Sequence, residues 1–302
     1  MAKILVTDGM DKNAALELKN LGHEVIEEHY EIDELNQKIK EVDAIIIRSA
    51  TKLRKETIDS AKETGQLKLM VRAGVGMDNI DVDYAKEKGI AVRNTPSASS
   101  AAVAELAIGH MFALARNIYC ANVTMRKGEW NKKAYKGVEL SGKTLGLIGF
   151  GRIAQSTAEK ARALGMKVIY YTRSGKKDGF DQYEYKEKEE LLKEADFISL
   201  HIPFVKNNGI TLGEKDFEIM KDGVYLVNCA RGGVVDEEAL LKALDSGKVA
   251  AAAIDVFEKE PTHNMNLVNH QCVSVTPHIG ASTKEAQGRI GEEIVTIVKE
   301  YF

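Results

Sequence analysis

The chain has 302 residues, of which 44% are hydrophobic and 29% are charged, and its net charge is −3. This length suffices for two globular domains, and because acidic and basic residues are interleaved we expect no nucleic-acid-binding or membrane-binding surface. The three cysteines form no Cys-x-x-Cys pair, so we expect neither a disulfide framework nor a metal site. Met1 leads directly into a strand-like run with no leader segment, and we therefore expect a cytoplasmic protein.

Short apolar runs rich in β-branched residues alternate with helix-like segments, a pattern typical of buried parallel strands in an α/β fold. The runs form two series, at residues 3–6, 24–26, 44–47, 68–71 and 90–92, and then at 144–148, 167–171, 197–200, 224–227, 251–254 and 273–275. A long buried helix is expected over residues 101–116 and a last helix over 282–299. We therefore predict three segments, 1–96, 97–279 and 280–302.

A glycine-rich turn, Gly149-Phe150-Gly151-Arg152-Ile153-Ala154, directly follows the predicted strand 144–148 and opens a helix. Glycines permit a tight turn and close backbone approach, and the free N–H groups at a helix start bind a pyrophosphate. Alanine suits the third position, which needs only a small side chain. We therefore expect a nicotinamide dinucleotide here, with Gly149, Gly151, Arg152 and Ile153 among its ligands.

The strand after this turn lacks the acidic residue that usually binds the adenine ribose of NAD. Tyr171 is followed by Thr172 and Arg173 where aspartate or glutamate is normal. An arginine there can pair with the 2′-phosphate of NADP, whereas a solvated arginine beside a ribose-binding Thr172 would suit NAD. We assign both residues to the cofactor site and leave NAD against NADP open.

Three residues with complementary chemistry lie after later predicted strands. Arg231 offers a cation for a carboxylate, Glu260 an orienting acid and His278 a base, which together suit hydride removal from a hydroxy acid. Each also has a plain structural explanation: a surface ion pair, a loop acid and a strand-end hydrogen bond. His110, within the apolar helix, is expected to be a buried core residue, and His201 a residue of a cofactor loop.

Further segments match a known family in order. They are residues 48–52, 71–79, 94–96, 103–105, 139–146, 228–236, 255–257, 260–261 and 277–287. Over essentially its whole length the chain resembles the D-isomer-specific 2-hydroxyacid dehydrogenases, and among them most closely the D-3-phosphoglycerate dehydrogenases. The resemblance implies a Rossmann dinucleotide-binding domain inserted into a flavodoxin-like substrate-binding domain, and a homodimer.

The resemblance also implies roles for individual residues. His278 would be the acid/base, Glu260 its partner and Arg231 the substrate-orienting cation. The backbone of Val75 and Gly76 would bind the substrate carboxylate. Asp255 would lie near the nicotinamide carboxamide, and the remaining cofactor contacts would come from His201, Pro203, Cys229, Ala230 and Gly280.

Arg48 and Arg72 stand where the family binds the far end of its substrate, and two arginines suit a phosphate. We therefore expect oxidation of 3-phospho-D-glycerate to 3-phosphohydroxypyruvate, a step of serine biosynthesis. The alternatives are an NADPH-preferring glyoxylate or hydroxypyruvate reductase and a non-enzymatic NAD-sensing corepressor. A short loop after Pro203, over residues 204–209, departs from the family pattern, and because the chain stops at Phe302 we expect no C-terminal regulatory domain.

Overall fold

The computed structural model describes residues 1–205 and 209–302, so residues 206–208 of the short loop lie outside the described residues. The chain divides into two compact units, which we call unit 1 (residues 1–100 and 281–302) and unit 2 (residues 101–280). The chain leaves unit 1, builds unit 2 and returns to complete unit 1. The boundaries between the units fall after residues 100 and 280, and we expected them after residues 96 and 279.

Unit 1 contains a five-stranded sheet in the order β2-β1-β3-β4-β5, in which every pair of neighbours is parallel. This order is that of flavodoxin-like folds, as expected. The strands are β1 (Lys3–Val6), β2 (Glu24–Glu27), β3 (Ala44–Ile47), β4 (Leu69–Arg72) and β5 (Ala91–Asn94).

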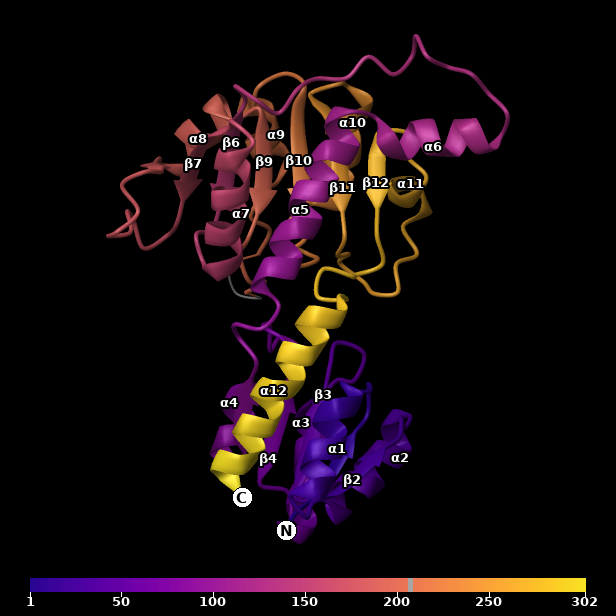
Figure 1. The fold of residues 1–302 in the computed structure, drawn as a ribbon, viewed down its shortest axis with the longest axis vertical. Helices are drawn as coiled ribbons and strands as arrows, with labels where there is room; N and C mark the ends of the chain where they lie inside the picture. The colour runs from indigo at the N-terminus through magenta and orange to yellow at the C-terminus, as the bar shows by residue number, and fades with distance from the viewer. Residues whose placement is uncertain (206–208) are drawn as a thin grey trace. The chain divides into compact units, whose positions relative to one another are not determined.

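Helices cover both faces of this sheet, and each face has its own buried core. One face carries α1 (Lys12–Asn20) and α12 (Lys284–Tyr301), which lie side by side (Figure 1). The other face carries α2 (Ile32–Lys38), η1 (Ile39–Glu41), α3 (Lys55–Thr64) and α4 (Val82–Glu87).

The two edge strands of unit 1 are less buried than its central strand. The central β3 is buried at every position, whereas Glu24 and Glu27 of β2 are exposed, as is Arg93 of β5. Both strands lie at an edge of the sheet, where a neighbouring strand is missing on one side. The expectation of a buried strand was therefore wrong for β2, whose predicted run includes Glu24, whereas the run predicted at β5, residues 90–92, contains no exposed residue and Arg93 lies just beyond it. Edge strands keep polar side chains in water.

Unit 2 contains a seven-stranded parallel sheet in the order β12-β11-β10-β9-β6-β7-β8. Read from β8, this is the Rossmann order with one further strand, which confirms the predicted fold class. The strands are β6 (Thr144–Ile148), β7 (Lys167–Tyr171), β8 (Glu184–Tyr185), β9 (Phe197–Leu200), β10 (Val224–Asn228), β11 (Val249–Ile254) and β12 (Val273–Val275).

Helices also cover both faces of the second sheet. One core lies under α5 (Ser100–Ala115) and α7 (Arg152–Ala163), which lie in front of the strands in Figure 1. The other core lies under α8 (Lys188–Glu194), α9 (Glu214–Ile219), α10 (Glu237–Asp245) and α11 (Met265–Val268). The remaining helix, α6 (Ile118–Arg126), has no buried residue. Among the described residues, no helix is both long and apolar enough to cross a membrane.

The closing helix α12 packs on α1 through a glycine. A Cβ placed on Gly291 would come 2.6 Å from the Cβ of Ala14 and 3.0 Å from that of Asp11. At the end of α12, Lys299 forms an ion pair of 2.7 Å with Glu17 of α1. The absence of a side chain at residue 291 therefore sets how closely the two helices approach.

Replacing Gly291 by alanine should destabilise the protein by about 1–3 kcal/mol, because the added methyl group forces the two helices apart. Gly288, in the same helix, is the matched control, since a Cβ placed on it would have no atom within 4 Å. Gly288→Ala should be neutral or stabilise by up to about 1 kcal/mol, since alanine favours helix. Urea unfolding of both variants measures the difference, and equal stability would contradict the packing argument.

Candidate active site

The glycine turn between β6 and α7 has the geometry needed to receive a pyrophosphate. Gly149 has φ of 93°, and a Cβ there would collide with the main-chain carbonyl of His201. Gly151 caps α7 with no side-chain hydrogen bond and has open space around it. The first N–H groups of this 12-residue helix, from Arg152 and Ile153 onward, are thus left for an anionic ligand. The residues present therefore fit a dinucleotide.

The end of β7 carries hydroxyl groups and a cation. The Thr172 hydroxyl donates to the carbonyl of Gly175 at 2.8 Å and lies 3.0 Å from the Ser174 hydroxyl. Arg173, between them, is exposed. A tight turn thus presents Arg173 at the place where a ribose-binding acid would stand in an NAD-specific protein.

His201, at the end of β9, lies against the glycine turn through its carbonyl oxygen. Its Nε2 is 3.0 Å from the buried Ser199 hydroxyl, and burial lowers the pKa of His201 to about 4. The imidazole is therefore neutral at neutral pH. The exposed Pro203 follows two residues later.

His278 and Glu260 form a close pair. The Nδ1 atom of His278 is 2.7 Å from Oε2 of Glu260, whose Oε1 accepts the amide of Phe257 at 3.1 Å. Partial burial by itself raises the pKa of Glu260, but the hydrogen bond and charge of His278, the Phe257 amide and the charge of Arg231 together hold it below its ordinary value. A carboxylate only accepts, so the pair places a proton on Nδ1 and leaves Nε2 of the neutral ring as a base.

Arg231 lies on the loop after β10, which a buried asparagine shapes. Asn228 donates from Nδ2 to the carbonyl of Arg231 at 2.9 Å and accepts the amide of Ala230 at 3.1 Å. The next residue, Gly232, lies so close to the carbonyl of Phe257 that no side chain would fit. This contact brings the Arg231 loop against the loop that carries Glu260.

Cys229, on the same loop, is buried, and burial raises the pKa of its thiol. The thiol is therefore uncharged at neutral pH and can contribute only an apolar surface to a neighbouring ligand. That property suits the expected place of Cys229 beside the cofactor, which stays a prediction.

Asp255, fully buried at the end of β11, holds the loop that carries His278. Its carboxylate accepts the amides of Ile279 at 2.8 Å and Gly280 at 3.0 Å, and its carbonyl accepts the amide of His278 at 2.8 Å. His278 has φ of 54°, in the left-handed region that a non-glycine residue adopts only when its surroundings require it. The expected contact of Asp255 with the nicotinamide stays a prediction, and the structure adds this loop-holding role.

In unit 1, the loop that carries Arg48 is held through its backbone by two buried side chains. Asp8 accepts the amides of Arg48 at 2.7 Å and Thr51 at 3.0 Å, and Asn79 donates to the carbonyls of the same two residues at 2.6 and 2.7 Å. The Arg48 side chain is half-buried and has no hydrogen-bond or ion-pair partner among residues 1–205 and 209–302. A guanidinium without a protein partner, carried on a loop whose backbone is held in place, suits an anionic ligand.

Arg72, the other arginine expected to bind the substrate, lies over the neighbouring turn. Its guanidinium occupies the space where a side chain on Gly74 would be, and its Nη1 is 3.3 Å from the carbonyl of Ala73. The carbonyl of Val75 accepts from Asn94 at 2.6 Å. The backbone of Val75 and Gly76 therefore belongs to a turn that is held from within unit 1.

The structure thus brings Arg231, Glu260 and His278 together in unit 2, and it places the expected substrate residues of unit 1 on two fixed loops. Sequence reasoning missed the side chains that fix these loops, namely Asp8, Asn79, Asn228 and Thr276, the last of which donates from its hydroxyl to the Asp255 carboxylate at 2.6 Å. The one available signal was their type and place: each is a short polar residue just past a predicted strand or within a matching segment.

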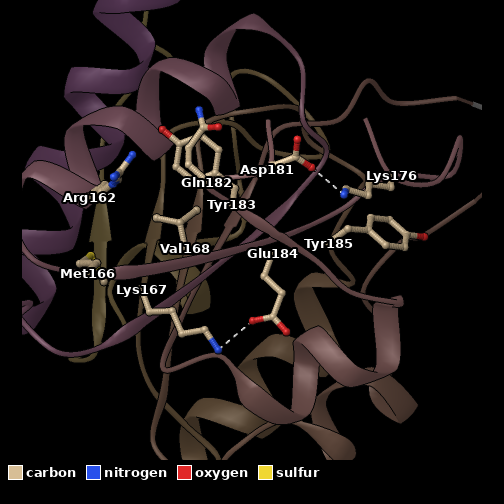
Figure 2. A pocket seen from close by; sticks show the side chains of 10 residues that line it. All are labelled: Arg162, Met166, Lys167, Val168, Lys176, Asp181, Gln182, Tyr183, Glu184 and Tyr185. Atoms are coloured by element: carbon tan, nitrogen blue, oxygen red, sulfur yellow. Dashed lines mark hydrogen bonds and ion pairs between the residues drawn. The ribbon is translucent and has the colours of Figure 1, made fainter. Parts of the chain in front are cut away.

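A separate hollow of about 580 Å³ lies beside β7 and β8 and contains none of the expected site residues. Its wall includes the ion pairs Lys167–Glu184 at 2.9 Å and Lys176–Asp181 at 2.7 Å (Figure 2). These side chains are exposed, so the pairs contribute little to stability. Across the described part of the chain, no three His, Cys, Asp or Glu side chains are grouped so as to hold a metal ion.

Residues 108–280 match the model of the D-isomer specific 2-hydroxyacid dehydrogenase family, NAD binding domain. The chain belongs to the D-isomer-specific 2-hydroxyacid dehydrogenases. The match covers most of unit 2, including the glycine turn and the Arg231, Glu260 and His278 loops. This 2-hydroxyacid dehydrogenase therefore uses NAD, and the predicted family and cofactor are confirmed.

Individual relatives extend the similarity to both units. A hydroxypyruvate reductase of Thermotoga maritima is 50% identical over 97% of this chain and 96% of that protein. A D-3-phosphoglycerate dehydrogenase of Methanocaldococcus jannaschii is 44% identical over 99% of this chain, which spans only 57% of that protein. The structure of a D-lactate dehydrogenase of Aquifex aeolicus complexed with NAD and lactic acid has a TM-score of 0.88 at 32% identity, covering 99% of this chain and 95% of that one.

Replacing His278 by alanine should lower turnover by about 100- to 10,000-fold, because the proton then has no positioned donor or acceptor. Affinity for NADH should stay within about twofold, since the glycine turn and α7 are untouched. Keto-acid reduction followed by NADH absorbance, with a fluorescence titration of NADH, measures both quantities. His263→Ala, at an exposed position, is the control and should be unchanged. Turnover above a tenth of the wild type in His278→Ala would contradict the assignment.

Proposed function

We propose that the chain oxidises 3-phospho-D-glycerate to 3-phosphohydroxypyruvate, and catalyses the reverse reduction, as a step of serine biosynthesis. The reaction type is supported by the His278–Glu260 pair at 2.7 Å beside the Arg231 loop. The substrate is supported by Arg48, whose guanidinium has no protein partner among the described residues and whose loop backbone is held by Asp8, and by the similarity to phosphoglycerate dehydrogenases.

The proposed chemistry divides among three side chains. Arg231 binds the substrate carboxylate, and Nε2 of His278 removes the proton of the C2 hydroxyl group. Glu260, a carboxylate whose pKa lies below its ordinary value, stabilises the imidazolium that results. NAD, when bound, accepts the hydride from C2. The complete set weighs against a corepressor that only senses the cofactor.

The phosphate end of the substrate would bind to unit 1. Arg48 and Arg72 provide two guanidinium groups, and the turn at Val75 and Gly76 provides backbone N–H groups for the carboxylate end. Asp8 and Asn79 hold the Arg48 loop in place before any ligand arrives, which reduces the entropy lost on binding.

A second candidate is a hydroxypyruvate or glyoxylate reductase. It is favoured by the 50% identity with the Thermotoga maritima hydroxypyruvate reductase, which has nearly the same extent as this chain. Use of NADPH is part of this candidate, and the exposed Arg173 at the end of β7 supports it. The two candidates share the reacting carbon and differ only at the far end of the substrate.

A comparison of substrates tests the proposal. Phosphohydroxypyruvate and hydroxypyruvate are each reduced with NADH and with NADPH, and kcat/KM is measured for the four combinations. We expect phosphohydroxypyruvate to be preferred by at least about tenfold, which corresponds to about 1.4 kcal/mol. A tenfold preference for hydroxypyruvate would establish the second candidate instead, and no turnover in any combination would favour the corepressor.

The phosphate assignment predicts the effect of Arg48→Gln. This variant should raise KM for phosphohydroxypyruvate by about 10- to 100-fold, because one charge-assisted hydrogen bond of about 1.5–3 kcal/mol is lost. The KM for hydroxypyruvate should change by less than about twofold. Arg54→Gln is the matched control, since Arg54 is exposed and pairs with Asp81. An equal rise for both substrates would show that Arg48 does not read the phosphate.

We also propose that the protein is a homodimer that uses α6 as its interface. The helix has no buried residue, and Ile118, Val123 and Met125 on it, with Trp130 just beyond, are exposed apolar side chains. Apolar side chains gathered in this way mark contact sites.

Sedimentation of the wild type should give twice the monomer mass, and sedimentation of Val123→Glu should give the monomer mass. Leu16→Glu, at an equally exposed apolar position on α1, should leave the mass unchanged; a monomeric wild type would refute the dimer.

A further inference from the structure

A buried histidine of helix α5 is linked to the active site by two successive hydrogen bonds. Nε2 of His110 lies 3.1 Å from the hydroxyl of Thr276, and that hydroxyl donates to Oδ1 of Asp255 at 2.6 Å. Threonine has a single hydroxyl proton, and it is committed to the carboxylate. The proton between His110 and Thr276 must therefore come from the imidazole, which fixes it on Nε2.

The link continues from Asp255 to His278. The carboxylate that accepts the Thr276 hydrogen bond also accepts the amides of Ile279 and Gly280, while the Asp255 carbonyl accepts the amide of His278. Three successive amides are thus tied to one buried residue, and they include the residue with the left-handed backbone. A rotation of the Asp255 carboxylate would release two of these amides at once.

The imidazole of His110 is not explained by packing alone. Its neighbours on α5 that line the core are alanine, valine, methionine and leucine, and a leucine would fill similar space without desolvating ring nitrogens. Burial lowers the pKa of His110, so the ring is neutral and offers one directed N–H donor. That donor reaches the Thr276 hydroxyl and orients it toward Asp255.

We infer that His110 is a positioning residue for the acid/base His278, acting through Thr276 and Asp255. The inference rests on the proposed role of His278 but not on the choice of substrate. In this inference the hydrogen bonds that link His110, Thr276 and Asp255 keep His278 in one orientation, so that its Nε2 meets the reacting hydroxyl or carbonyl group.

Single substitutions test the two hydrogen bonds. His110→Leu and Thr276→Val each remove one bond and should lower kcat by about fivefold to twentyfold, with KM for the keto acid and the dissociation constant of NADH within about twofold. His110→Gln keeps an N–H donor and Thr276→Ser keeps the hydroxyl, so both should recover at least half of the wild-type kcat. Met111→Ala loosens the packing of the same helix but leaves the hydrogen bonds among His110, Thr276 and Asp255 intact. It should lower thermal stability while leaving kcat within about twofold of the wild type.

The double variant decides whether the residues act together. If His110, Thr276 and Asp255 act together, kcat of the double variant His110→Leu, Thr276→Val should be within about twofold of kcat of the slower single variant. Multiplication of the two losses would overturn the inference, as would an unchanged kcat in His110→Leu. Equal losses in His110→Leu and His110→Gln would also overturn it. Turnover by His278→Ala distinguishes failure of the inference from failure of the proposed function, because that variant would remain active only if His278 were not the acid/base.

Discussion

The buried carboxylate of Asp255 is the interaction on which the arrangement of unit 2 depends most. An unpartnered buried carboxylate is costly, and here its cost is offset by one hydroxyl and two amide donors from a single loop. The same interactions determine the backbone conformation of His278. Stability and catalytic geometry are therefore provided by one set of hydrogen bonds, and neither can be altered without the other.

The same principle recurs in the other loops of the site. Asn228 shapes the Arg231 loop, and Asp8 with Asn79 shapes the Arg48 loop, in each case through backbone groups and not through the functional side chain. Glu260 is different, because its own carboxylate also accepts the amide of Phe257 on the loop that carries it. Buried polar residues at the carboxyl ends of strands position the loops, and partly exposed residues on those loops carry out the chemistry.

The sequence predicted most strands to within two residues of their bounds, because their apolar runs stand out from the helical segments between them. The observed bounds of β1, β3, β6, β7, β9 and β12 are those expected, whereas β8 was missed because two residues carry no periodic signal. The glycine turn and the catalytic candidates were also visible, since their residue types are unusual at strand ends. The positioning residues were not, because Asp8, Asn228 and Thr276 act on partners that only the folded chain brings near. His110 was expected to be buried, but its link to Thr276, 166 residues later, has no local signature.

The return of the chain to unit 1 has a consequence for how the protein is made. Ile290, Ile294 and Val298 of α12 complete the core on one face of the first sheet, next to Ile4 and Val6. During synthesis the first hundred residues emerge early, yet this apolar face must wait for α12, while unit 2 is continuous and can fold as soon as residue 280 is available. Unit 1 therefore finishes folding only after unit 2 has been translated, and in that interval the apolar face that α12 will cover is open to water.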